Sequence, residues 1–563
     1  MRARVRRWWS SVRWPLLALL TIAALVLGHL GFRDHLVAVG EPAPFSRVFY
    51  LALQLFVLES GSAPPPTPWT LEVARLLAPA VTLYSAAVAL AAVFREEIGR
   101  ARLRTYRGHA VVCGLGDRGL LLARSFRAAG VRVAAVERDR DSPGVGAARA
   151  AGAVVVVGDA SDPEVLRQAR LPRASVVVSV CGDDGADAGI ASIAQRLAPR
   201  RADPVRVFAH IADPGLRALL QAGELARPGG HALVELFDVA ERGAGVMMSQ
   251  LPPGPVDGAR APHAIVLGLG ALGAAVVLKA ARWWRDRRRG SDRIRITIVD
   301  LTARSGVEGL LRDHRGLASV AELVPVDAPA GSAEFRESAL LMDATSPVDA
   351  IYVCEVEVAR SLALAALLRE SIAAPMLVRV GAGPPPRALD GTRFFFLLQE
   401  TCAPQVLLGG VYERIARAIH ADYVRREEAL GHTPVDNPSM VPWDRLPDRL
   451  KASNRAQAAD IGSKLGAIGC VIDPGSDWDA PLLELDTEEV ETLARMEHDR
   501  WTRRLLDDGW SFSSGAKDPV AKTHPDLVPY DSLSDEKREA DRSTVRGIPA
   551  FLETVGFHAR RID

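Results

Sequence analysis

The fold is decided by the stretch His109-Ala-Val-Val-Cys-Gly114-Leu-Gly116-Asp-Arg-Gly119, in which an apolar run leads into the pattern G-x-G-x-x-G. An amphipathic segment through Ala129 follows. This order predicts a buried strand, a tight turn, and a helix whose first amides can approach a pyrophosphate. A second strand is predicted at Val131–Val136, and Glu137 at its end stands where an acid can accept hydrogen bonds from ribose hydroxyls.

Further short apolar runs continue this unit, separated by helical segments. They lie at Ala153–Val157, Ser175–Val180 and Val205–His210, and Gly158-Asp159-Ala160 forms the turn after the first of them. Strands that alternate with helices in this way form a parallel, doubly wound sheet. The sequence therefore predicts a Rossmann-like α/β unit.

The whole pattern occurs a second time. A strand at His263–Leu267 runs into Gly268, Gly270 and Gly273, and Ile294–Val299 ends at Asp300. Asp327 takes the place that Asp159 has in the first copy. Strands are also predicted at Ala350–Cys354 and Met376–Val380. Two tandem Rossmann-like units are expected.

Two apolar stretches precede these units, at Trp14–Phe32 and Leu76–Phe94. Each is long enough to cross a hydrocarbon core of roughly 30 Å. Arginines cluster before the first stretch and after the second: Arg2, Arg4, Arg6, Arg7, Arg13, Arg95, Arg100, Arg102, Arg104 and Arg107. By the positive-inside rule both termini are expected in the cytoplasm. The alternative for the first stretch is a signal peptide.

Between these stretches lies a shorter apolar run, Val48–Leu58, which is too short to cross a membrane. It predicts a re-entrant helix, as in a two-span pore subunit. The alternative is an amphipathic helix lying on the bilayer surface. The next residues, Glu59, Ser60 and Gly61, are the candidate pore residues. They do not form the T-V-G-Y-G filter of potassium channels, and a ring of Glu59 carboxylates would favour cations.

The length, the net charge and the cysteine count limit the possible functions of the chain. A length of 563 residues suggests three or four units, and a formal net charge of +1 argues against nucleic-acid binding. Five cysteines stand singly, which fits neither a disulfide framework nor a zinc site and agrees with a reducing cytosol. The expected domains are 1–107 in the membrane, 108–250 and 262–412 as α/β units, and 413–563 as a linker helix with a small, mainly helical domain.

The two α/β units resemble the RCK (TrkA-N-like) domains that regulate potassium conductance, over roughly residues 108–245 and 262–410. The shared features are the first strand, the glycine-rich turn, the acid and the Gly-Asp-Ala turn. The resemblance implies a gating ring formed by homo-oligomers, which by analogy are tetramers. It also implies binding of an adenine nucleotide such as NAD, ATP, ADP or a related messenger. The residues implied as nucleotide contacts are Gly114, Gly116, Gly119, Glu137, Asp159, Gly268, Gly270, Gly273, Asp300 and Asp327. Alternatively, the glycines serve the fold and a site is empty.

The C-terminal region begins with a predicted helix at Val411–Arg426 and a proline-marked boundary at Pro434–Pro442. A long helix is expected at Thr487–Leu506, because acids in its first turn match the helix dipole. A Glu497-His498 pair on this helix lacks a second histidine at i+3 or i+4. A metal site is therefore not expected there.

Several motifs in this region resemble the ryanodine-receptor-type repeat: Glu497-His498-x-x-Trp501, Gly509-Trp510, His524-Pro525-x-Leu527-Val528-Pro529-Tyr530 and Glu536-Lys537. In bacteria this repeat accompanies nucleotide-signalling proteins, which implies a nucleotide-derived messenger as ligand. The candidate ligand residues are Arg455, Glu497, His498, Arg500, Trp501, Trp510, Lys522, His524 and Tyr530. Aromatic rings offer stacking faces, and Arg455, Arg500, Arg503 and Lys522 can pair with phosphates. The alternative is that the aromatic residues form the core of a small helical domain.

Together these features predict a ligand-gated ion channel subunit of the inner membrane, conducting an inorganic cation and without catalytic residues. One alternative is a non-conducting membrane-anchored sensor. A membrane-tethered NAD-dependent oxidoreductase is disfavoured, because no catalytic domain with a paired base and substrate pocket follows either α/β unit.

Overall fold

The structure is a computed structural model of the chain. It describes residues 2–57, 67–201, 203–227, 231–255, 260–288, 290–329, 332, 347–381, 392–475 and 477–562. The candidate pore residues Glu59, Ser60 and Gly61 lie outside these ranges. The chain divides into two compact units, Met1–Ala101 and Arg102–Asp563.

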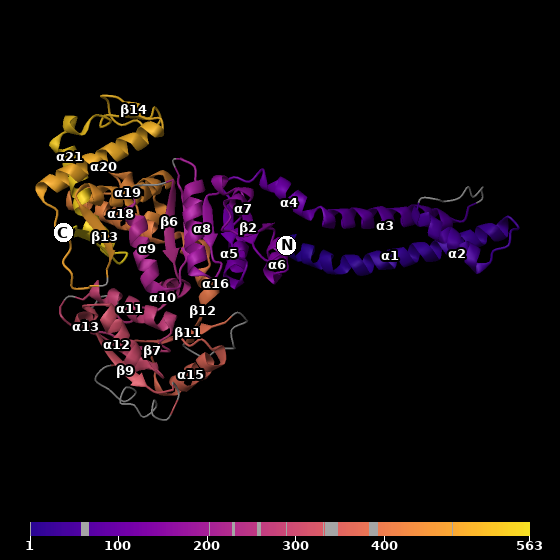
Figure 1. Ribbon diagram of the computed structural model, residues 1–563, viewed down its shortest axis with the longest axis horizontal. Coiled ribbons are helices and arrows are strands. Elements are labelled where there is room, and N and C mark those ends of the chain that lie inside the picture. The colour runs from indigo at the N-terminus through magenta and orange to yellow at the C-terminus, as the bar shows by residue number, and fades with distance from the viewer. Residues whose placement is uncertain are drawn as a thin grey trace. The chain divides into compact units, whose positions relative to one another are not determined.

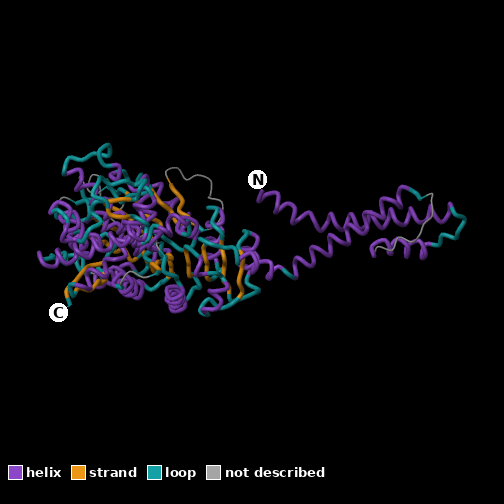
Figure 2. Tube along the Cα trace, turned by 90° about the horizontal axis from the view of Figure 1, so that it is seen from above, coloured by secondary structure: helices purple, strands orange, loops and turns teal. Residues whose placement is uncertain are grey.

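The N-terminal unit contains the two apolar helices that the sequence predicts (Figures 1 and 2). They are α1 (Arg2–Ala38) and α3 (Trp69–Val93), which α4 (Arg95–Leu103) follows. The segments long and apolar enough to cross a membrane are Pro15–Ala38, with a mean hydropathy of 2.1, and Trp69–Leu90, with 1.6. The first segment extends beyond its predicted end at Phe32, and the second begins before its predicted start at Leu76.

Small residues allow α1 and α3 to pack closely. A Cβ atom at Gly31 would lie 2.6 Å from the backbone nitrogen of Leu71, so this crossing requires glycine. The short apolar run forms α2 (Phe45–Gln54), continued by a 3₁₀ turn at Leu55–Val57. Its residues Val48 and Leu55 are buried in one cluster with residues of α1 and α3.

The first α/β unit is a six-stranded parallel sheet with the strand order β3-β2-β1-β4-β5-β6. Its strands are β1 (Ala110–Cys113), β2 (Val133–Glu137), β3 (Val154–Val157), β4 (Val176–Ser179), β5 (Val205–His210) and β6 (Ala232–Phe237). The helices between them are α5 (Asp117–Ala128), α6 (Pro143–Ala150), α7 (Pro163–Gln168), α8 (Asp184–Leu197) and α9 (Pro214–Ala226), and α10 (Val239–Gln250) follows β6. Strands buried on both faces explain the unbroken valine runs.

The second α/β unit repeats this topology, with the order β12-β11-β10-β7-β8-β9. Its strands are β7 (His263–Leu267), β8 (Ile294–Asp300), β9 (Ala321–Asp327), β10 (Ala350–Val353), β11 (Met376–Val380) and β12 (Thr392–Phe396). Its helices are α11 (Ala271–Arg285), α12 (Ala303–Asp313), α13 (Leu317–Val320), α15 (Val358–Ser371), α16 (Leu397–Thr401) and α17 (Pro404–Leu408). Two doubly wound parallel sheets are thus confirmed. The sequence analysis did not identify β6 in the first sheet or β9 and β12 in the second.

The C-terminal region is mainly helical, as predicted. Its helices are α18 (Val411–Ala429), α19 (Asp448–Ala467), α20 (Thr487–Asp507), α21 (Asp535–Arg546) and α22 (Ile548–Glu553). Two small sheets accompany them, an antiparallel pair of β13 (Cys470–Pro474) with β16 (Phe557–Arg561) and a pair of β14 (Ser511–Phe512) with β15 (Thr523–His524). A capping box joins Asp486 and Glu489 and fixes the start of α20.

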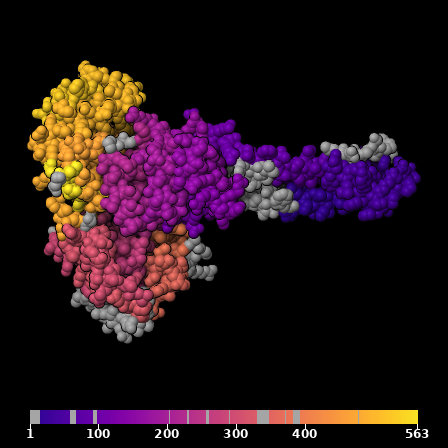
Figure 3. Space-filling model, in the orientation of Figure 1, coloured from indigo at the N-terminus to yellow at the C-terminus, as the bar shows by residue number. Residues whose placement is uncertain are grey.

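This region shares a hydrophobic cluster with the first α/β unit. The cluster contains Ala222 and Leu225 of α9 and Leu233 of β6, together with residues of α18, α19 and α20. A Cβ atom at Gly462 of α19 would lie 2.1 Å from the carbonyl oxygen of Leu225, so the two helices meet at backbone distance. Figure 3 shows the C-terminal elements packed directly on the first α/β unit. A conformational change in the C-terminal region is therefore transmitted to the first α/β unit, and the reverse.

Candidate functional site

The first glycine-rich turn lies between β1 and α5, where the strand order reverses. Gly114 has a φ of +86°, and a Cβ atom at Gly119 would lie 1.8 Å from the carbonyl oxygen of Gly114. The second unit repeats both features, with a φ of +88° at Gly268 and a distance of 1.9 Å from a Cβ at Gly273 to the Gly268 carbonyl oxygen. These four glycines are required by the fold itself.

The middle glycine of each motif has no such role. Gly116 and Gly270 are the N-cap residues of α5 and α11, with ordinary φ angles of −63° and −67°. A Cβ atom at either position would meet nothing within 4 Å. Any residue could therefore adopt this backbone, and the lack of a side chain leaves the helix N-terminus open to a ligand.

The acid at the end of the second strand clamps the glycine-rich turn in both units. Glu137 accepts the backbone N–H of Leu115 at 2.7 Å, and Asp300 accepts the N–H of Leu269 at 2.8 Å. Burial raises the pKa of Asp300, but bonds from the N–H groups of Leu269 and Thr302 outweigh it and lower that pKa. Both carboxylates thus hold the turn, and the lowered pKa keeps that of Asp300 ionised.

The next acid differs between the units. Asp159 accepts the N–H of Ser161 at 2.8 Å and lines the cavity described below. Asp327 instead accepts the N–H of Arg304 at 2.8 Å and pairs with its Nε at 3.2 Å. Asp327 is thus already occupied by a side chain of its own unit.

A cavity of about 1520 Å³ lies between the carboxyl ends of the two sheets. Ligands of open α/β folds bind at this edge, and usual ligand pockets span roughly 300–1,000 Å³. Of the predicted residues, the cavity is lined by Gly114, Gly116, Glu137, Asp159, Gly268, Gly270 and Asp300. Gly119, Gly273 and Asp327 are not part of its lining. The two predicted sites therefore open into one shared space.

The sequence analysis quoted Asp117 and Arg118 only as part of the first glycine motif, and both line this cavity. It did not identify Arg124 of α5 or Arg379 of β11, which also line it. Arg124 lies seven residues after Asp117, on the same side of α5, which is the one signal that could have shown it. Arg379 comes from the other unit, so only the tertiary structure reveals it.

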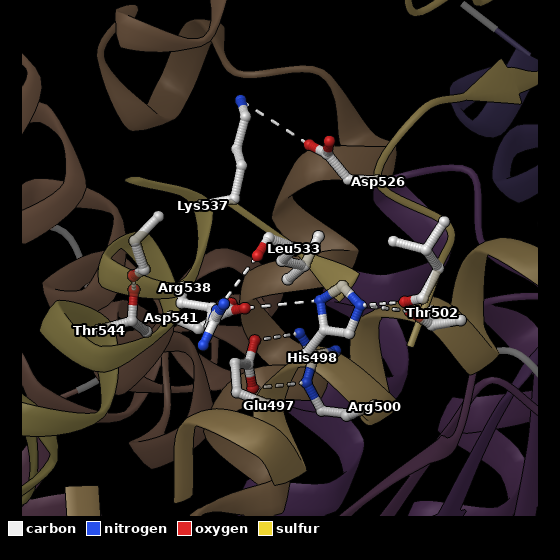
Figure 4. Close-up of polar contacts among 12 residues, drawn as sticks. Glu497, His498, Arg500, Thr502, Asp526, Leu533, Lys537, Arg538, Asp541 and Thr544 are labelled. Atoms are coloured by element: carbon white, nitrogen blue, oxygen red, sulfur yellow. Dashed lines mark hydrogen bonds and ion pairs between the residues drawn. The ribbon is translucent and has the colours of Figure 1, made fainter. Parts of the chain in front are cut away.

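A buried ionic network underlies the C-terminal candidate site (Figure 4). Glu497 binds Arg500 through two bonds of 2.9 and 2.6 Å and lies 2.9 Å from Nζ of Lys464. Burial raises the pKa of Glu497, but Arg500 and Lys464 together lower it to about 2. Nη1 of Arg500 is buried and has no hydrogen-bond partner among the described residues.

His498 lies beside this network and connects it to the following loop. Its Nε2 lies 2.8 Å from the carbonyl oxygen of Val528, and its Nδ1 lies 3.5 Å from Asp541. Burial lowers the pKa of His498, but the bonds to Asp541 and Val528 outweigh it and raise that pKa. Figure 4 shows Asp541 and Thr502 on opposite sides of the ring.

The predicted aromatic residues fall into two groups. Trp501, Trp510 and His524 are half-buried and adjacent, with ring centroids 5.0 Å apart for Trp501 and His524 and 6.3 Å apart for Trp510 and His524. Tyr530 is 2 % exposed and belongs to the core, with Arg495 over its ring at 5.0 Å. The half-buried group offers stacking surface, whereas Tyr530 serves packing.

Two further candidates lie apart from the buried Glu497 network. Arg455 of α19 binds Glu413 of α18 at 2.5 and 3.2 Å, which ties these two helices together. Lys522 is exposed, and its Nζ donates to the carbonyl oxygen of Asp508 at 2.7 Å. The sequence analysis did not identify Lys464, whose contact with Glu497 spans two helices. Within the described residues, no group of three His, Cys, Asp or Glu side chains could hold a metal ion.

Comparison with known proteins supports both resemblances. Residues 110–225 match the model of the TrkA-N domain, and residues 481–561 match that of the RyR domain. The expectation that the chain is not an enzyme agrees with these two matches.

Solved structures of the channel GsuK are similar over most of their length. GsuK bound to ADP is 15 % identical, with 73 % of this chain and 98 % of that chain covered and a TM-score of 0.35. The GsuK channel alone is 16 % identical, with 70 % and 95 % covered and a TM-score of 0.35. The form bound to NAD is 11 % identical, with 73 % and 84 % covered and a TM-score of 0.35. These scores are too low to transfer a function.

The family matches, the two parallel sheets and the N-terminal helices agree with one another. The chain carries a TrkA-N domain in its first α/β unit and a RyR domain at its carboxyl end, behind two helices long and apolar enough to cross a membrane.

Proposed function

We propose that this chain is the subunit of a ligand-gated cation channel, and that its α/β units bind an adenine nucleotide or dinucleotide in the shared cavity. The observation that most strongly supports nucleotide binding is the pair of glycines Gly116 and Gly270. Neither glycine is needed by the backbone or by packing, and each leaves a helix N-terminus open at the cavity. Amides at such a terminus attract phosphate oxygens.

The residues around the glycines support the same ligand class. Glu137 and Asp300 stand at the ends of β2 and β8, where a ribose hydroxyl can donate to them. Arg118 and Arg379 supply positive charge from the two units. A nucleotide that touches both units favours one distance between the sheets, and this differential affinity is what gating requires.

The N-terminal unit supplies the pore in this proposal. The helix α2 is buried through Val48 and Ala52, and the 3₁₀ turn after it through Leu55, for which Gly28 of α1 leaves room. This packing favours a re-entrant helix over one lying alone on the bilayer. Phe45 and Tyr50 on α2 are 71 % and 63 % exposed, and Val57 in the following 3₁₀ turn is 75 % exposed, which leaves apolar surface for lipid or for neighbouring copies in a tetramer.

The pore residues Glu59, Ser60 and Gly61 follow this helix and belong to the proposal on sequence grounds alone. The topology proposed is multi-pass in the inner membrane, with both termini in the cytoplasm. In this arrangement the carboxylate of Glu59 faces the conducting cation at the pore mouth.

A second ligand is proposed at the RyR domain, a nucleotide-derived messenger. The half-buried rings of Trp501, Trp510 and His524 provide stacking faces. The unpartnered Nη1 of Arg500 is a buried donor, and such donors are costly unless a ligand satisfies them. Messenger binding here would act on α20, which packs in the cluster shared with the first α/β unit.

Nucleotide binding is tested on the purified full-length chain with ADP and NAD, the ligands of the compared GsuK structures. Isothermal titration is expected to show saturable binding that Gly116→Val weakens by about 100-fold, because an isopropyl group blocks the helix N-terminus. The matched control is Gly146→Val, at an exposed glycine of α6 where a Cβ also meets nothing within 4 Å. Equal affinity in Gly116→Val and wild type would refute the proposed site.

A non-conducting membrane-anchored sensor is the remaining alternative. It shares every binding result above and differs only in the absence of a nucleotide-dependent current. Electrical recording therefore separates the two functions.

A further inference from the structure

A second cavity, of about 630 Å³, lies where the three parts of the larger unit meet. Its walls come from β6 and α10 of the first α/β unit, α11 of the second, and α18 and α22 of the C-terminal region. No part of either glycine-rich turn lines it. This junction cavity is therefore distinct from the proposed nucleotide cavity.

Basic side chains from three helices converge on the junction cavity. They are Arg242 of α10, Lys279, Arg282 and Arg285 of α11, and Arg414 of α18. With Arg287, which follows α11, elements far apart in the sequence thus bring six cations to one space. Such convergence is costly unless the charges are matched.

Most acidic groups at the cavity are already paired. Glu241 binds Lys279 at 3.2 Å and Arg217 at 3.3 Å. Glu553 lies 3.2 Å from Arg285. Glu235 lies 3.0 Å from Arg206. Asp286, the last acid near Arg285, lies 3.7 Å from it and is 62 % exposed.

Four guanidinium groups of the lining have no carboxylate partner in any ion pair between described residues. One of them, Arg287, donates to the carbonyl oxygen of Trp283 at 3.2 Å and follows α11, and the other three belong to three different helices. Arg242 donates to the carbonyl oxygen of Val406 at 3.0 Å, and its Cζ lies 4.5 Å from the ring centroid of Phe237. Cζ of Arg282 lies 5.3 Å from the ring centroid of Trp478. Arg414 donates to the carbonyl oxygen of Thr554. Carbonyl oxygens and ring faces orient these groups, and Glu235, Glu241 and Asp286 offset their charge only through longer-range interactions. The lining as a whole has six basic and five acidic side chains, which leaves an excess of positive charge.

The titration behaviour of the cluster agrees with this excess of positive charge. Burial lowers the pKa of Arg242 to about 10 and that of Lys279 to about 8, although Glu235 and Glu241 oppose the shift. Burial also lowers the pKa values of Arg282 and Arg414. The charged forms are therefore destabilised as the protein stands, and an anion in the cavity would relieve this.

We infer that the junction cavity is a binding site for a phosphate-bearing anion, with Arg242, Arg282 and Arg414 as its ligands. Guanidinium groups bind phosphate oxygens through paired hydrogen bonds. The volume suits a di- or triphosphate group, free or carried by a nucleotide. Because the three arginines belong to three helices, a bound anion would hold α10, α11 and α18 in one arrangement. The site can thereby modulate any conformational change of the unit.

The test uses the purified full-length chain and inorganic tripolyphosphate, which has neither base nor ribose. Isothermal titration at low salt is expected to show saturable binding, weakened at least about tenfold in the double variant Arg282→Gln and Arg414→Gln. The matched control is Arg312→Gln, which removes one charge from an exposed arginine of α12. Thermal unfolding checks that the double variant is folded. Its unfolding midpoint is not expected to fall, because two charges of like sign are removed.

A second arm separates this site from the proposed nucleotide cavity. Gly116→Val is expected to retain tripolyphosphate binding. In that background, competition by ATP assigns the site to nucleotide phosphates, and lack of competition assigns it to inorganic polyphosphate. Undetectable tripolyphosphate binding, or binding lost in Gly116→Val and unchanged in the double arginine variant, would overturn the inference without affecting the nucleotide proposal.

Discussion

The two α/β units share a strand order and a glycine-rich turn, yet they offer different chemistry to a ligand. Both have an acid that clamps the turn, Glu137 or Asp300, and both leave the helix N-terminus open. Asp159 of the first unit faces the cavity, whereas Asp327 of the second is bound by Arg304.

The helix starts differ as well. The first unit continues its motif with Asp117 and Arg118, and the second with Ala271 and Leu272. The comparison teaches that the glycines and the acid preserve the shape of the turn, while the residues beside them decide how strongly a nucleotide is held. We therefore expect the first unit to be the tighter site.

The largest expected effect tests what the units share. Gly119→Val and Gly273→Val should each destabilise the protein by about 3 kcal/mol or more, because the added Cβ overlaps a backbone carbonyl oxygen. Thermal unfolding of the full-length chain, followed by tryptophan fluorescence, measures this. Gly146→Val serves as the control. A wild-type unfolding midpoint in either variant would show that its turn is not packed as described.

The next effect tests how the units differ. Gly116→Val should weaken ADP or NAD binding by about 100-fold, whereas Gly270→Val should weaken it by about tenfold or less, since the second unit lacks a cavity-facing counterpart of Arg118 and Asp159. Titration calorimetry on both variants gives the ratio. The reverse order of effects would identify the second unit as the main site.

A smaller effect is expected at Asp159 and Asp327, the acids that hold equivalent positions in the two units. Asp159→Asn should weaken nucleotide binding by about threefold to tenfold, because one hydrogen-bond acceptor oxygen is lost at the cavity wall. Asp327→Asn should leave binding unchanged and cost no more than about 1 kcal/mol of stability, because its pair with Arg304 is exposed. If the two substitutions affect affinity equally, the distinction drawn between these acids is wrong.

The smallest effect concerns the RyR domain and depends on pH. The pKa of His498 is raised from its usual 6.5, so its contribution to stability is complete below 6.5 and is lost as the pH rises through the folded-state value. The unfolding midpoint of the wild type should be higher than that of His498→Gln, and the difference should be larger at pH 6 than at pH 8. Glutamine keeps a donor for the Val528 carbonyl oxygen. A difference that does not vary with pH would show that the charge on His498 is unimportant.

The local parts of this structure were predictable from the sequence, since a strand, a glycine turn and an acid lie within about thirty residues of one another. The strands β6, β9 and β12 were not identified, because each lies at a sheet edge far from a glycine motif. The apolar helices were found, but their ends were not, because flanking residues such as Trp69 continue the helix beyond the apolar core.

The long-range features could not be predicted. The shared cavity depends on how two sheets face one another, and Arg379 enters it from the second unit. The pairing of Arg455 with Glu413, and of Lys464 with Glu497, likewise joins helices that only the tertiary fold brings together. A basic residue in a sequence motif can equally bind a ligand or a neighbouring helix.

The central claim, that nucleotide binding in the α/β units gates a cation pore, is tested most directly by recording current through the full-length protein in planar bilayers. Addition of ADP or NAD to the side of the α/β units is expected to change a cation current in wild type and in Gly146→Val. The change should be absent in Gly116→Val. Tight nucleotide binding without any nucleotide-dependent current would contradict the claim and leave a membrane-anchored sensor.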